Sequence, residues 1–370
     1  MKKKLVLAGA GHAHMLTMAR LDSFVEAGFE VNVIGSSEYH YYSGMGPGML
    51  GNVYSPEEIR FASKTVAEKM GATFTQGQVK LIDPVAQRVQ LVSGDEHPYD
   101  VLSCNLGSQV SRDLTDGSRK DVFPVKPIEN LLHARQRILE LGHAKNISVG
   151  VVGGGVSAVE IAGNVWRLGQ EPGMHPIKTT LFAGSRILPH HPDGVRRLVC
   201  SSLQKRDIRI EEDCRVQAIE TGRVVSVGGR DYEPDIIFVA TGVSPSPVFR
   251  ESGIPTGPDG AMMVNSYLQN PAHPTIFGGG DGVYFAASPL DKVGVYAVRQ
   301  NPVIYHNLLA SLRGKELRSF VPGGRYMQIF NMGNDTGIFY RWPFRFGGRS
   351  AFRLKNYIDN QFMKRYQAVE

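Results

Sequence analysis

The first forty residues place short apolar runs on either side of a glycine-rich turn. Residues 5–8 read Leu-Val-Leu-Ala, and they lead directly into Gly9-Ala-Gly11-His12-Ala-His14. The residues after the turn have the apolar spacing of a helix, and residues 29–34 form a second apolar run. Short apolar runs bounded by glycine are typical of buried parallel strands. The pattern therefore predicts a strand–turn–helix–strand unit.

The same pattern returns near the middle of the chain. Residues 147–152 form an apolar run that leads into Gly153-Gly-Gly155, a second helical pattern and another strand-like run at 179–182. Both copies close with an apolar run that ends in glycine, at Gly107 and Gly242. Glycine lets such a turn approach a pyrophosphate, and the helix that follows offers free N–H groups to the phosphates. The repeat predicts two nucleotide-binding modules in tandem.

A third glycine-rich segment follows the second module. Residues 275–282 read Thr-Ile-Phe-Gly-Gly-Gly-Asp-Gly, which predicts a strand that ends at Gly280 and Asp281. A carboxylate at a strand end can accept hydrogen bonds from the hydroxyl groups of a polyol. Residues 289–300 predict the start of another helix, whose N-terminal amides favour negative charge in front of them. The three segments together indicate an α/β protein of doubly wound modules.

The composition predicts a large buried core, and the charge is concentrated at one end. The chain has 370 residues, of which 42% are hydrophobic, and its formal net charge is +6. Residues 315–370 hold ten basic and four acidic side chains, which accounts for the entire net charge. A basic tail on a neutral body favours an acidic partner surface, and a solvated face is the alternative. The apolar runs are too short to predict a membrane span or a signal peptide.

These motifs resemble those of the two-dinucleotide-binding-domain flavoproteins, the pyridine nucleotide-disulfide oxidoreductase superfamily. Within that superfamily the sequence looks nearest to type II NADH dehydrogenases and sulfide:quinone reductases. More narrowly, it resembles the family often found fused ahead of selenide, water dikinase. The segments that carry the resemblance are 9–14, 42–48, 102–108, 126–127, 294–302 and 356–363.

The resemblance implies two Rossmann-like domains of the glutathione reductase type and a C-terminal α+β extension. It assigns FAD to residues 1–110 and 246–315, NAD(P)H to residues 111–245, and the extension to residues 316–370. The residues carried over to FAD are Gly9, Gly11, His12, His14, Ser36, Glu38, Ser43, Gly44, Met45, Gly107, Ser108, Gly280, Asp281, Gly294 and Val295. Those carried over to NAD(P)H are Gly153, Gly155, Ser157, Arg186, Thr241 and Gly242.

Both modules depart from the superfamily pattern after their second strand. An acidic residue usually stands there and binds the adenosine ribose. The first module has Gly-Ser-Ser at 35–37 with Glu38 after it, and the second has Ala-Gly-Ser at 183–185 followed by Arg186. Serine and arginine in place of an acid favour the 2′-phosphate of NADPH over NADH. A module that has lost nicotinamide binding would show the same change.

The cysteines exclude the thiol chemistry of the disulfide reductases in this superfamily. Cys104, Cys200 and Cys214 form no CxxC pair, which also argues against a disulfide framework or a zinc site and indicates a reducing, cytosolic setting. We therefore expect no metal, packing roles for the cysteines, and direct electron transfer from the flavin to an acceptor.

Glu160 and Lys292 are the expected catalytic residues. Glu160 lies five residues past Gly155 on a predicted helix, where the resemblance implies a carboxylate that faces nicotinamide and flavin. A carboxylate there can order the nicotinamide amide or relay a proton, and complementing the helix dipole is the alternative. A Lys292 cation near the flavin would stabilise negative charge on the reduced flavin or on a quinone oxygen.

The C-terminal extension interleaves aromatic residues with arginines and then predicts a helix over residues 350–366. Leu354, Ile358, Phe362 and Tyr366 form an apolar stripe at i+4 spacing on this helix, with basic residues beside it. In the related flavoproteins this region covers the flavin and, in the quinone reducers, faces the membrane. We therefore expect a helix that lies on an anionic membrane surface. Packing of the stripe on the FAD-binding domain, or a homodimer contact, are the alternatives.

The sequence as a whole predicts an FAD-dependent oxidoreductase that passes a hydride from NAD(P)H to flavin and on to a quinone-like or other small acceptor. One alternative is a flavoprotein of selenium or sulfur metabolism whose second module is partly vestigial. Another is a flavin-binding redox sensor. Nucleic acid is not an expected partner, because the sequence contains no recognised nucleic-acid module. The expected location is the cytoplasm, with peripheral attachment to the inner face of the membrane.

Overall fold

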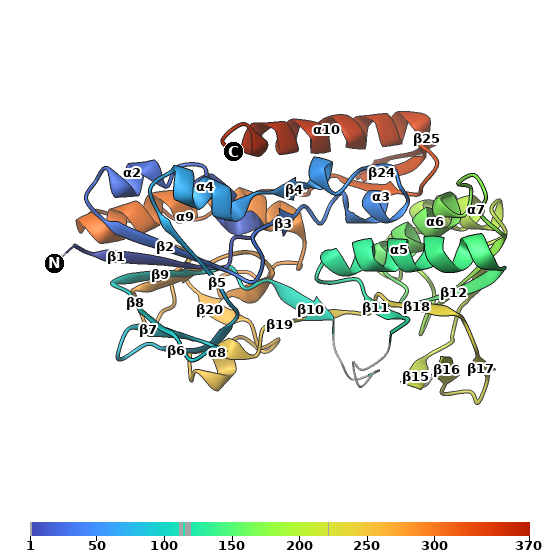
Figure 1. Cartoon of the computed structure of the whole chain (residues 1–370), viewed down its shortest axis with the longest axis horizontal. Coiled ribbons are helices and arrows are strands. Elements are labelled where there is room, and N and C mark those ends of the chain that lie inside the picture. The colour runs from blue at the N-terminus through green and yellow to red at the C-terminus, as the bar shows by residue number, and fades with distance from the viewer. Residues whose placement is uncertain (1, 111–113, 115–119, 221) are drawn as a thin grey trace.

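Two five-stranded parallel sheets lie at the centres of the two halves of the chain (Figure 1). The computed structural model describes residues 2–110, 114, 120–220 and 222–370. The first sheet has the order β21-β9-β1-β2-β5. Its strands are β1 (Lys4–Ala8), β2 (Glu30–Gly35), β5 (Thr73–Gln76), β9 (Val101–Cys104) and β21 (Ile276–Gly278).

The second sheet repeats the arrangement of the first. Its order is β11-β18-β12-β13-β14. Its strands are β11 (Val122–Pro124), β12 (Ile147–Val152), β13 (Ile177–Phe182), β14 (Arg209–Glu211) and β18 (Ile236–Val239). In each sheet the strand before the glycine turn, β1 or β12, lies between the next strand of its unit and the closing strand. The predicted pair of doubly wound units is confirmed.

The helices after the two glycine turns differ from each other. The second turn leads into α6 (Val156–Leu168), an uninterrupted helix as predicted. The first leads into a single 3₁₀ turn, η1 (His12–His14), and two short helices, α1 (Met15–Met18) and α2 (Asp22–Val25). The amides of Arg20 and Phe24 donate to carbonyl oxygens three residues back, and these tight turns interrupt the helix that the sequence predicts there.

The remaining helices cover the sheets and connect the two halves. They are α3 (Gly46–Leu50), η2 (Glu57–Ile59), α4 (Ser63–Lys69), α5 (Glu129–Ala144), α7 (Asp193–Gln204), α8 (Val248–Glu251), η3 (Gly280–Gly282) and α9 (Gly294–Arg313). Helix α9 begins at Gly294, whereas the sequence pattern predicted a start at residue 289. Lys292 therefore lies in the loop before the helix. The amphipathic segment at 194–203 forms α7.

Smaller sheets flank the two central ones, and all of them are antiparallel except the parallel pair of β20 and β22. The strands β10 (Ser108–Val110) and β19 (Val243–Pro245) pair with each other and join the two halves side by side. The other small strands are β3 (His40–Tyr41), β4 (Arg60–Phe61), β6 (Val79–Asp83), β7 (Arg88–Leu91), β8 (Glu96–Pro98), β15 (Val216–Glu220), β16 (Arg223–Ser226), β17 (Asp231–Tyr232), β20 (Met262–Val264) and β22 (Val283–Phe285).

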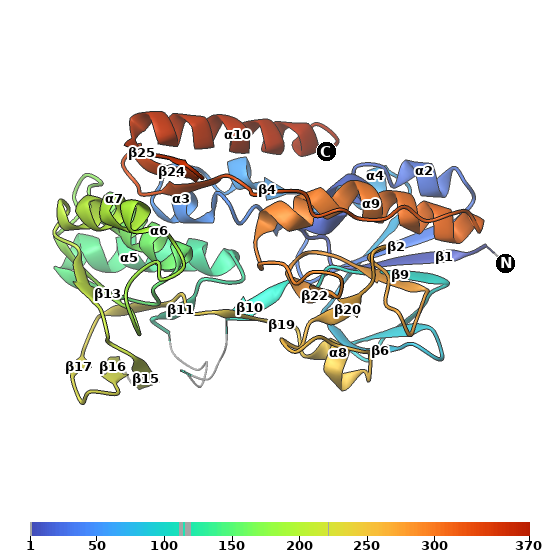
Figure 2. The same cartoon turned by 180° about the vertical axis from the view of Figure 1, so that it is seen from behind.

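The C-terminal extension crosses both halves. After α9 the chain runs back alongside that helix (Figure 2), where Arg299 donates a 2.6 Å hydrogen bond to the carbonyl oxygen of Pro322. It then forms an antiparallel sheet and α10 (Arg349–Gln367), which confirms the predicted helix. The strands of this sheet are β23 (Gln328–Asn331), β24 (Gly337–Arg341) and β25 (Phe344–Gly348). No helix in the described part of the chain combines the length and apolar composition needed to cross a membrane.

The apolar stripe of α10 divides between two surfaces. Phe362 and Tyr366 point inward, where the Phe362 ring centroid lies 4.8 Å from that of Tyr42 and 6.2 Å from that of Phe61. Leu354 and Ile358 are exposed. The expectation of one continuous exposed stripe is therefore only half met, because a residue every four positions drifts around a helix of 3.6 residues per turn.

Helix α6 meets the extension at a glycine. A Cβ atom on Gly163 would lie 2.5 Å from the carbonyl oxygen of Met332, just after β23. A Cβ atom on Gly142 in α5 would instead meet the terminal methyl group of Met174 at 2.3 Å. A methionine side chain can rotate away, whereas a backbone carbonyl fixed beside a strand cannot.

We predict that Gly163→Ala lowers the stability of the protein although alanine favours helices by about 1 kcal/mol. Overpacking against a fixed carbonyl costs about 1–3 kcal/mol, which exceeds that gain. Gly142→Ala is the matched control and should change stability by less than about 1 kcal/mol. Urea denaturation followed by circular dichroism measures both variants. A Gly163→Ala protein as stable as Gly142→Ala would contradict the close contact.

Candidate functional site

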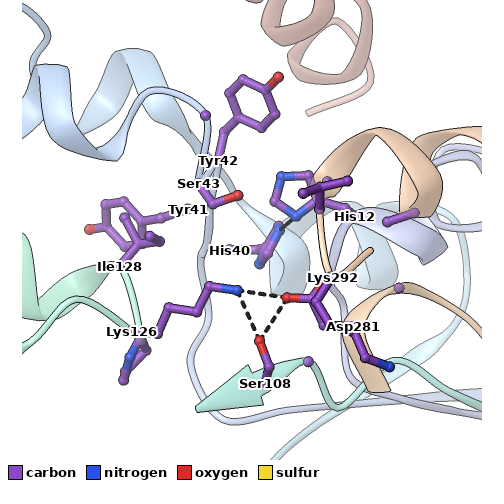
Figure 3. Close-up of a pocket in the computed structure, with 18 of the residues that line it drawn as sticks. His12, His40, Tyr41, Tyr42, Ser43, Ser108, Lys126, Ile128, Asp281 and Lys292 are labelled. Atoms are coloured by element: carbon purple, nitrogen blue, oxygen red, sulfur yellow. Dashed lines mark hydrogen bonds and ion pairs between the residues drawn. The ribbon is translucent and has the colours of Figure 1, made fainter. Parts of the chain in front are cut away.

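A cavity of about 850 Å³ lies between the two halves and beneath the C-terminal extension. Its walls come from the first glycine turn, the loops after β2 and β9, the start of α6, the loop before α9, and the inner face of α10. Figure 3 shows one region of it, where charged and aromatic side chains converge. A cavity of this size is in the range that binds cofactors and drug-sized ligands.

The two glycine turns place their first glycine in the same close contact. Gly9 has a φ angle of +94°, and a Cβ atom there would lie 2.2 Å from the carbonyl oxygen of Asn105 after β9. Gly153 has a φ angle of +143°, and a Cβ atom there would lie 2.3 Å from the carbonyl oxygen of Ala240 after β18. Both the backbone angle and the space therefore require glycine, which explains why the motif recurs.

Ser108, Lys126 and Asp281 form a hydrogen-bonded triangle on the cavity wall (Figure 3). Lys126 Nζ lies 2.7 Å from Asp281 Oδ2, and the Ser108 hydroxyl donates to the same oxygen at 2.7 Å. Burial favours the neutral acid, but Lys126 and Ser108 outweigh it and hold the pKa of Asp281 below its usual value. Asp281 is therefore an ionised acceptor at neutral pH.

His12 and His40 form a second polar contact in the cavity. Nε2 of His40 lies 3.1 Å from Nδ1 of His12, so the two rings share one hydrogen bond. Burial lowers the pKa of His12 to about 4 and lowers the pKa of His40 well below its usual value, so both rings are neutral at pH 7. Nε2 of His12 is buried and has no hydrogen-bond partner among the described residues. It is available to a ligand in the cavity.

His14 does not line the cavity, which differs from the expectation that it contacts a cofactor. Its ring is fully buried, with Nδ1 2.5 Å from the carbonyl oxygen of Gly9 and Nε2 2.7 Å from the Ser103 hydroxyl. Both ring nitrogens are used to fix the glycine turn from behind. Met45 is likewise buried in the core, and Glu38 forms a partly exposed ion pair with Lys64.

The second turn contributes less to this cavity than the first. Of its predicted residues, Ser157 lines the cavity, whereas Gly153, Gly155, Arg186, Thr241 and Gly242 do not. Arg186 lies in the loop after β13, half exposed, with Nη1 3.0 Å from Asp193 Oδ1. The positions in which a nucleotide would meet these residues therefore lie outside the enclosed space.

Glu160 lines the cavity from α6 and is partly buried. Its Oε1 accepts a 2.6 Å hydrogen bond from the backbone N–H of Asn331 in β23. Burial raises the pKa of this carboxyl group to about 7, against the opposing charge of Lys355. A carboxyl group with a pKa near 7 can both hold and release a proton at physiological pH.

Lys292 also lines the cavity, but its charge is already compensated. Its Nζ donates a 2.7 Å hydrogen bond to the carbonyl oxygen of Val283 and lies 2.9 Å from Asp259 Oδ2. The ammonium group is thus held by Val283 and Asp259, and Lys292 itself lies two residues before the start of α9 at Gly294.

The cavity brings together most of the residues predicted from the first module. The predicted residues that line it are Gly9, Gly11, His12, Ser36, Ser43, Gly44, Gly107, Ser108, Ser157, Glu160, Gly280, Asp281, Lys292, Gly294 and Val295. Five further residues line it that were not predicted as site residues: Tyr42, Lys126 and Asp359, which lie in segments that carry the resemblance, and His40 and Lys355, which do not. A lysine and an aspartate four residues apart on a helix were a visible signal for Lys355 and Asp359, but nothing in the sequence indicated which way that helix face points.

The lining of the cavity fits FAD. The Gly9 turn lines the cavity with its backbone, and Nε2 of His12 and Nδ2 of Asn105 are buried polar atoms without a partner in the described residues. Ionised Asp281 with Ser108 can accept and donate hydrogen bonds to a polyol chain, and the N-terminus of α9 faces the other end of the cavity. These are the features that a dinucleotide flavin needs.

A family profile described as pyridine nucleotide-disulphide oxidoreductase matches residues 3–302. The chain belongs to this family. The expected resemblance to the superfamily is thereby confirmed, and FAD and NAD(P)H are the cofactors of the family.

Several proteins of similar sequence are named for the reduction of quinones. The demethylphylloquinone reductase NdbB of Synechocystis is 27% identical over 303 residues, covering 78% of this chain and 73% of that protein. A type II NADH:quinone oxidoreductase of Staphylococcus epidermidis is 25% identical over 390 residues, covering 97% and 95%. The sulfide:quinone oxidoreductase of Aquifex aeolicus superimposes with a TM-score of 0.78 at 19% identity, covering 100% of this chain and 92% of that one, which shows a shared fold.

We predict that Asp281→Asn weakens FAD binding about 10- to 150-fold, since a charge-assisted hydrogen bond is worth about 1.5–3 kcal/mol. FAD titration into the apoprotein, followed by quenching of flavin fluorescence, measures the dissociation constant. Asp235→Asn is the matched control, because Asp235 also binds one lysine and one serine, at 2.6 Å and 2.8 Å, but does not line the cavity. Equal FAD affinity in the two variants would remove Asp281 from the site.

Proposed function

We propose that this chain is an FAD-dependent NAD(P)H:quinone oxidoreductase. In this proposal residues 1–110 and 246–315 hold FAD, residues 111–245 hold NAD(P)H, and residues 316–370 cover the flavin. The observation that carries the proposal is one continuous cavity that contains the Gly9 turn, Asp281, Glu160 and the inner face of α10. A cavity shared by these elements lets a nicotinamide and a second substrate reach the same flavin.

A quinone is the acceptor that the similar proteins favour. The two relatives aligned above are named for the reduction of demethylphylloquinone and of quinone, and one of them matches nearly the whole chain. None of the cavity-lining residues in the described part of the chain is a cysteine. Cys104 is buried in β9, and burial raises the pKa of its thiol. This distribution favours direct electron transfer over sulfur chemistry.

FAD, when bound here, accepts two electrons as a hydride from NAD(P)H and passes them to the acceptor. Ser108 and Asp281 would hold its ribityl hydroxyls, and the N–H groups at the start of α9, with Lys292 beside them, would face its pyrimidine edge. Arg186 would bind the adenosine 2′-phosphate of NADPH in competition with Asp193. Glu160 would give the acceptor oxygen the proton that reduction of a quinone requires in addition to the hydride.

We predict that Glu160→Gln slows acceptor reduction by about 10²- to 10⁴-fold, the usual contribution of a general acid. Glutamine keeps an oxygen for the Asn331 N–H but has no proton to give. In the wild type the rate should fall as the pH rises through about 7, because the proton donor is the protonated form, and this dependence should be absent in Glu160→Gln.

Anaerobic stopped-flow absorbance separates the two half-reactions. NAD(P)H bleaches the flavin in the first, and a water-soluble quinone restores its colour in the second. Bleaching should change little in Glu160→Gln. A wild-type flavin that NADH and NADPH both fail to bleach, or that no quinone reoxidises, is incompatible with the proposed function.

The same proposal includes attachment to an anionic membrane through the outer face of the extension. This outer face, which we call the aromatic face, consists of Trp342, Phe344, Phe346, Leu354, Tyr357 and Ile358, all exposed. Exposed arginines lie among these residues in the sequence, at positions 341, 345, 349 and 353. Figure 1 shows α10 along one edge of the molecule, with its outer side uncovered. Ile358 also lines the cavity, so a lipid-dissolved quinone would enter beside it.

We predict that the protein binds vesicles containing anionic lipid at low salt and is released as salt rises. Arg349→Glu with Arg353→Glu should weaken binding about 30-fold or more, since each basic residue near such a surface contributes about 1 kcal/mol. Lys80→Glu with Lys178→Glu changes the net charge equally on exposed positions elsewhere and should have a small effect. Vesicle sedimentation measures both. Failure of the wild type to bind anionic vesicles at low salt would make the aromatic face a protein contact, and a homodimer would then be visible by analytical ultracentrifugation.

A further inference from the structure

Helix α10 carries a buried ion pair on the face that closes the cavity. The side chains of Lys355 and Asp359, one helical turn apart, are 9% and 7% exposed, and Nζ lies 2.7 Å from Oδ2. Lys355 also donates a 2.8 Å hydrogen bond to the carbonyl oxygen of Gly44. Among ion pairs of the described residues this is the most buried. Because desolvation offsets much of the attraction, such a pair adds little stability, and the presence of two buried charges here needs another reason.

The second carboxylate oxygen of Asp359 is also engaged. Oη of Tyr42 donates to Oδ1 at 3.3 Å. Burial, followed by the charge of Asp359, raises the pKa of Tyr42, so the phenol keeps its proton at any physiological pH. The ring of Tyr42 packs against those of His12 and Phe362, with centroids 5.2 Å and 4.8 Å away. Asp359 is therefore fixed on both sides, and it fixes Lys355 in turn.

These charges act on Glu160. From α10, Lys355 favours its carboxylate form and Asp359 opposes it. From β23, the Asn331 N–H also favours the carboxylate, and the phenol of Tyr54, in the loop after α3, lies within the influence of the Glu160 charge. Glu160, Lys355, Asp359 and Gly44 all line the same cavity. The ion pair thus presents Glu160 with two opposite charges, of which Lys355 has the larger effect and Asp359 offsets part of it.

We propose that Asp359 is a positioning residue for the proton transfer from Glu160 to the acceptor, because it holds Lys355 on Gly44 and offsets its charge. The inference rests on the function proposed above, and it names Asp359 as the group that adjusts the pKa of the proton donor Glu160. In the transfer, the O–H bond of Glu160 breaks, a bond forms between that proton and the acceptor oxygen, and the electron pair stays on the carboxylate. Lys355 then stabilises this carboxylate, and a proton from solvent restores the acid.

The test is Asp359→Asn in the FAD-loaded protein. The variant removes the negative charge that opposes Lys355, and this single change favours the Glu160 carboxylate. The titration midpoint of Glu160 should move to lower pH, measured by NMR of ¹³C-labelled glutamate carboxyl groups, with Glu160→Gln to assign the signal. Acceptor reduction at pH 8 should fall about tenfold, since a shift of one pH value in the midpoint changes the protonated fraction by that factor. Bleaching of the flavin by NAD(P)H should be unchanged.

A second variant separates charge from packing. Lys355→Met with Asp359→Leu removes both charges with side chains of similar volume, a replacement that buried ion pairs usually tolerate. Because Lys355 has the larger effect on Glu160, the midpoint should stay or move to higher pH, opposite to Asp359→Asn. Acceptor reduction should also slow, since the product carboxylate has lost its cation. Asp359→Glu keeps the charge and should restore the wild-type pH profile.

The outcomes distinguish this inference from the proposed function. An Asp359→Asn protein whose Glu160 midpoint stays at the wild-type pH would overturn the inference, as would a double variant with the wild-type acceptor rate and pH profile. Either result would mean that the ion pair has only a structural role, in which it attaches α10 to the backbone at Gly44. A wild-type protein that no quinone reoxidises would instead overturn the proposed function, whatever the NMR titration shows.

Discussion

The structure depends on one contact that is made twice, the contact of a turn glycine with a carbonyl oxygen on the next strand. At Gly9 and at Gly153 the backbone of the turn lies so close to the neighbouring strand end that a single Cβ atom would overlap an oxygen. Because of this contact the turn lies against the ends of the parallel strands. The side of the turn that faces away from the strands is left open. In the first half that outer side is the wall of the cavity, and the loops after β2 and β9 gather around it. His14 supports the arrangement from behind by bonding the carbonyl oxygen of Gly9.

The cavity that results contains buried charges, and their pairing decides what each can do. Asp281 is held by Lys126 and Ser108, which keeps it ionised as an acceptor. Asp359 is held by Lys355 and Tyr42. Glu160 has a backbone N–H as its hydrogen-bond donor, and no ion pair to it is found in the described part of the chain. Of these three carboxyl groups, Glu160 is therefore the one that can gain and lose a proton near pH 7. The charges of Lys355 and Asp359 influence its pKa.

The C-terminal extension connects this chemistry to the outside of the molecule. Its strand β23 supplies the N–H that binds Glu160, and its helix α10 supplies Lys355, Asp359 and Phe362 to the cavity. The outer side of the same helix carries Leu354, Tyr357 and Ile358 in the open. A change in how the extension rests on the two halves would alter the environment of the acid and the access to the cavity together, because one helix bears both.

The sequence by itself determined the elements that depend on local chain chemistry. Strand β12 covers the predicted residues, and α10 extends the predicted helix by one residue at each end. The two glycine turns occur at the predicted positions. These predictions succeed because periodicity and glycine conformation act over a few residues. Only the tertiary structure decided that His14 turns away from the cavity and that Phe362 and Tyr366 pack inward while Leu354 and Ile358 are exposed. It also decided that Asp359 meets Tyr42. These contacts join residues up to 317 positions apart. A side chain on a helix or turn has several neighbours it could face, and the packing of distant elements selects among them.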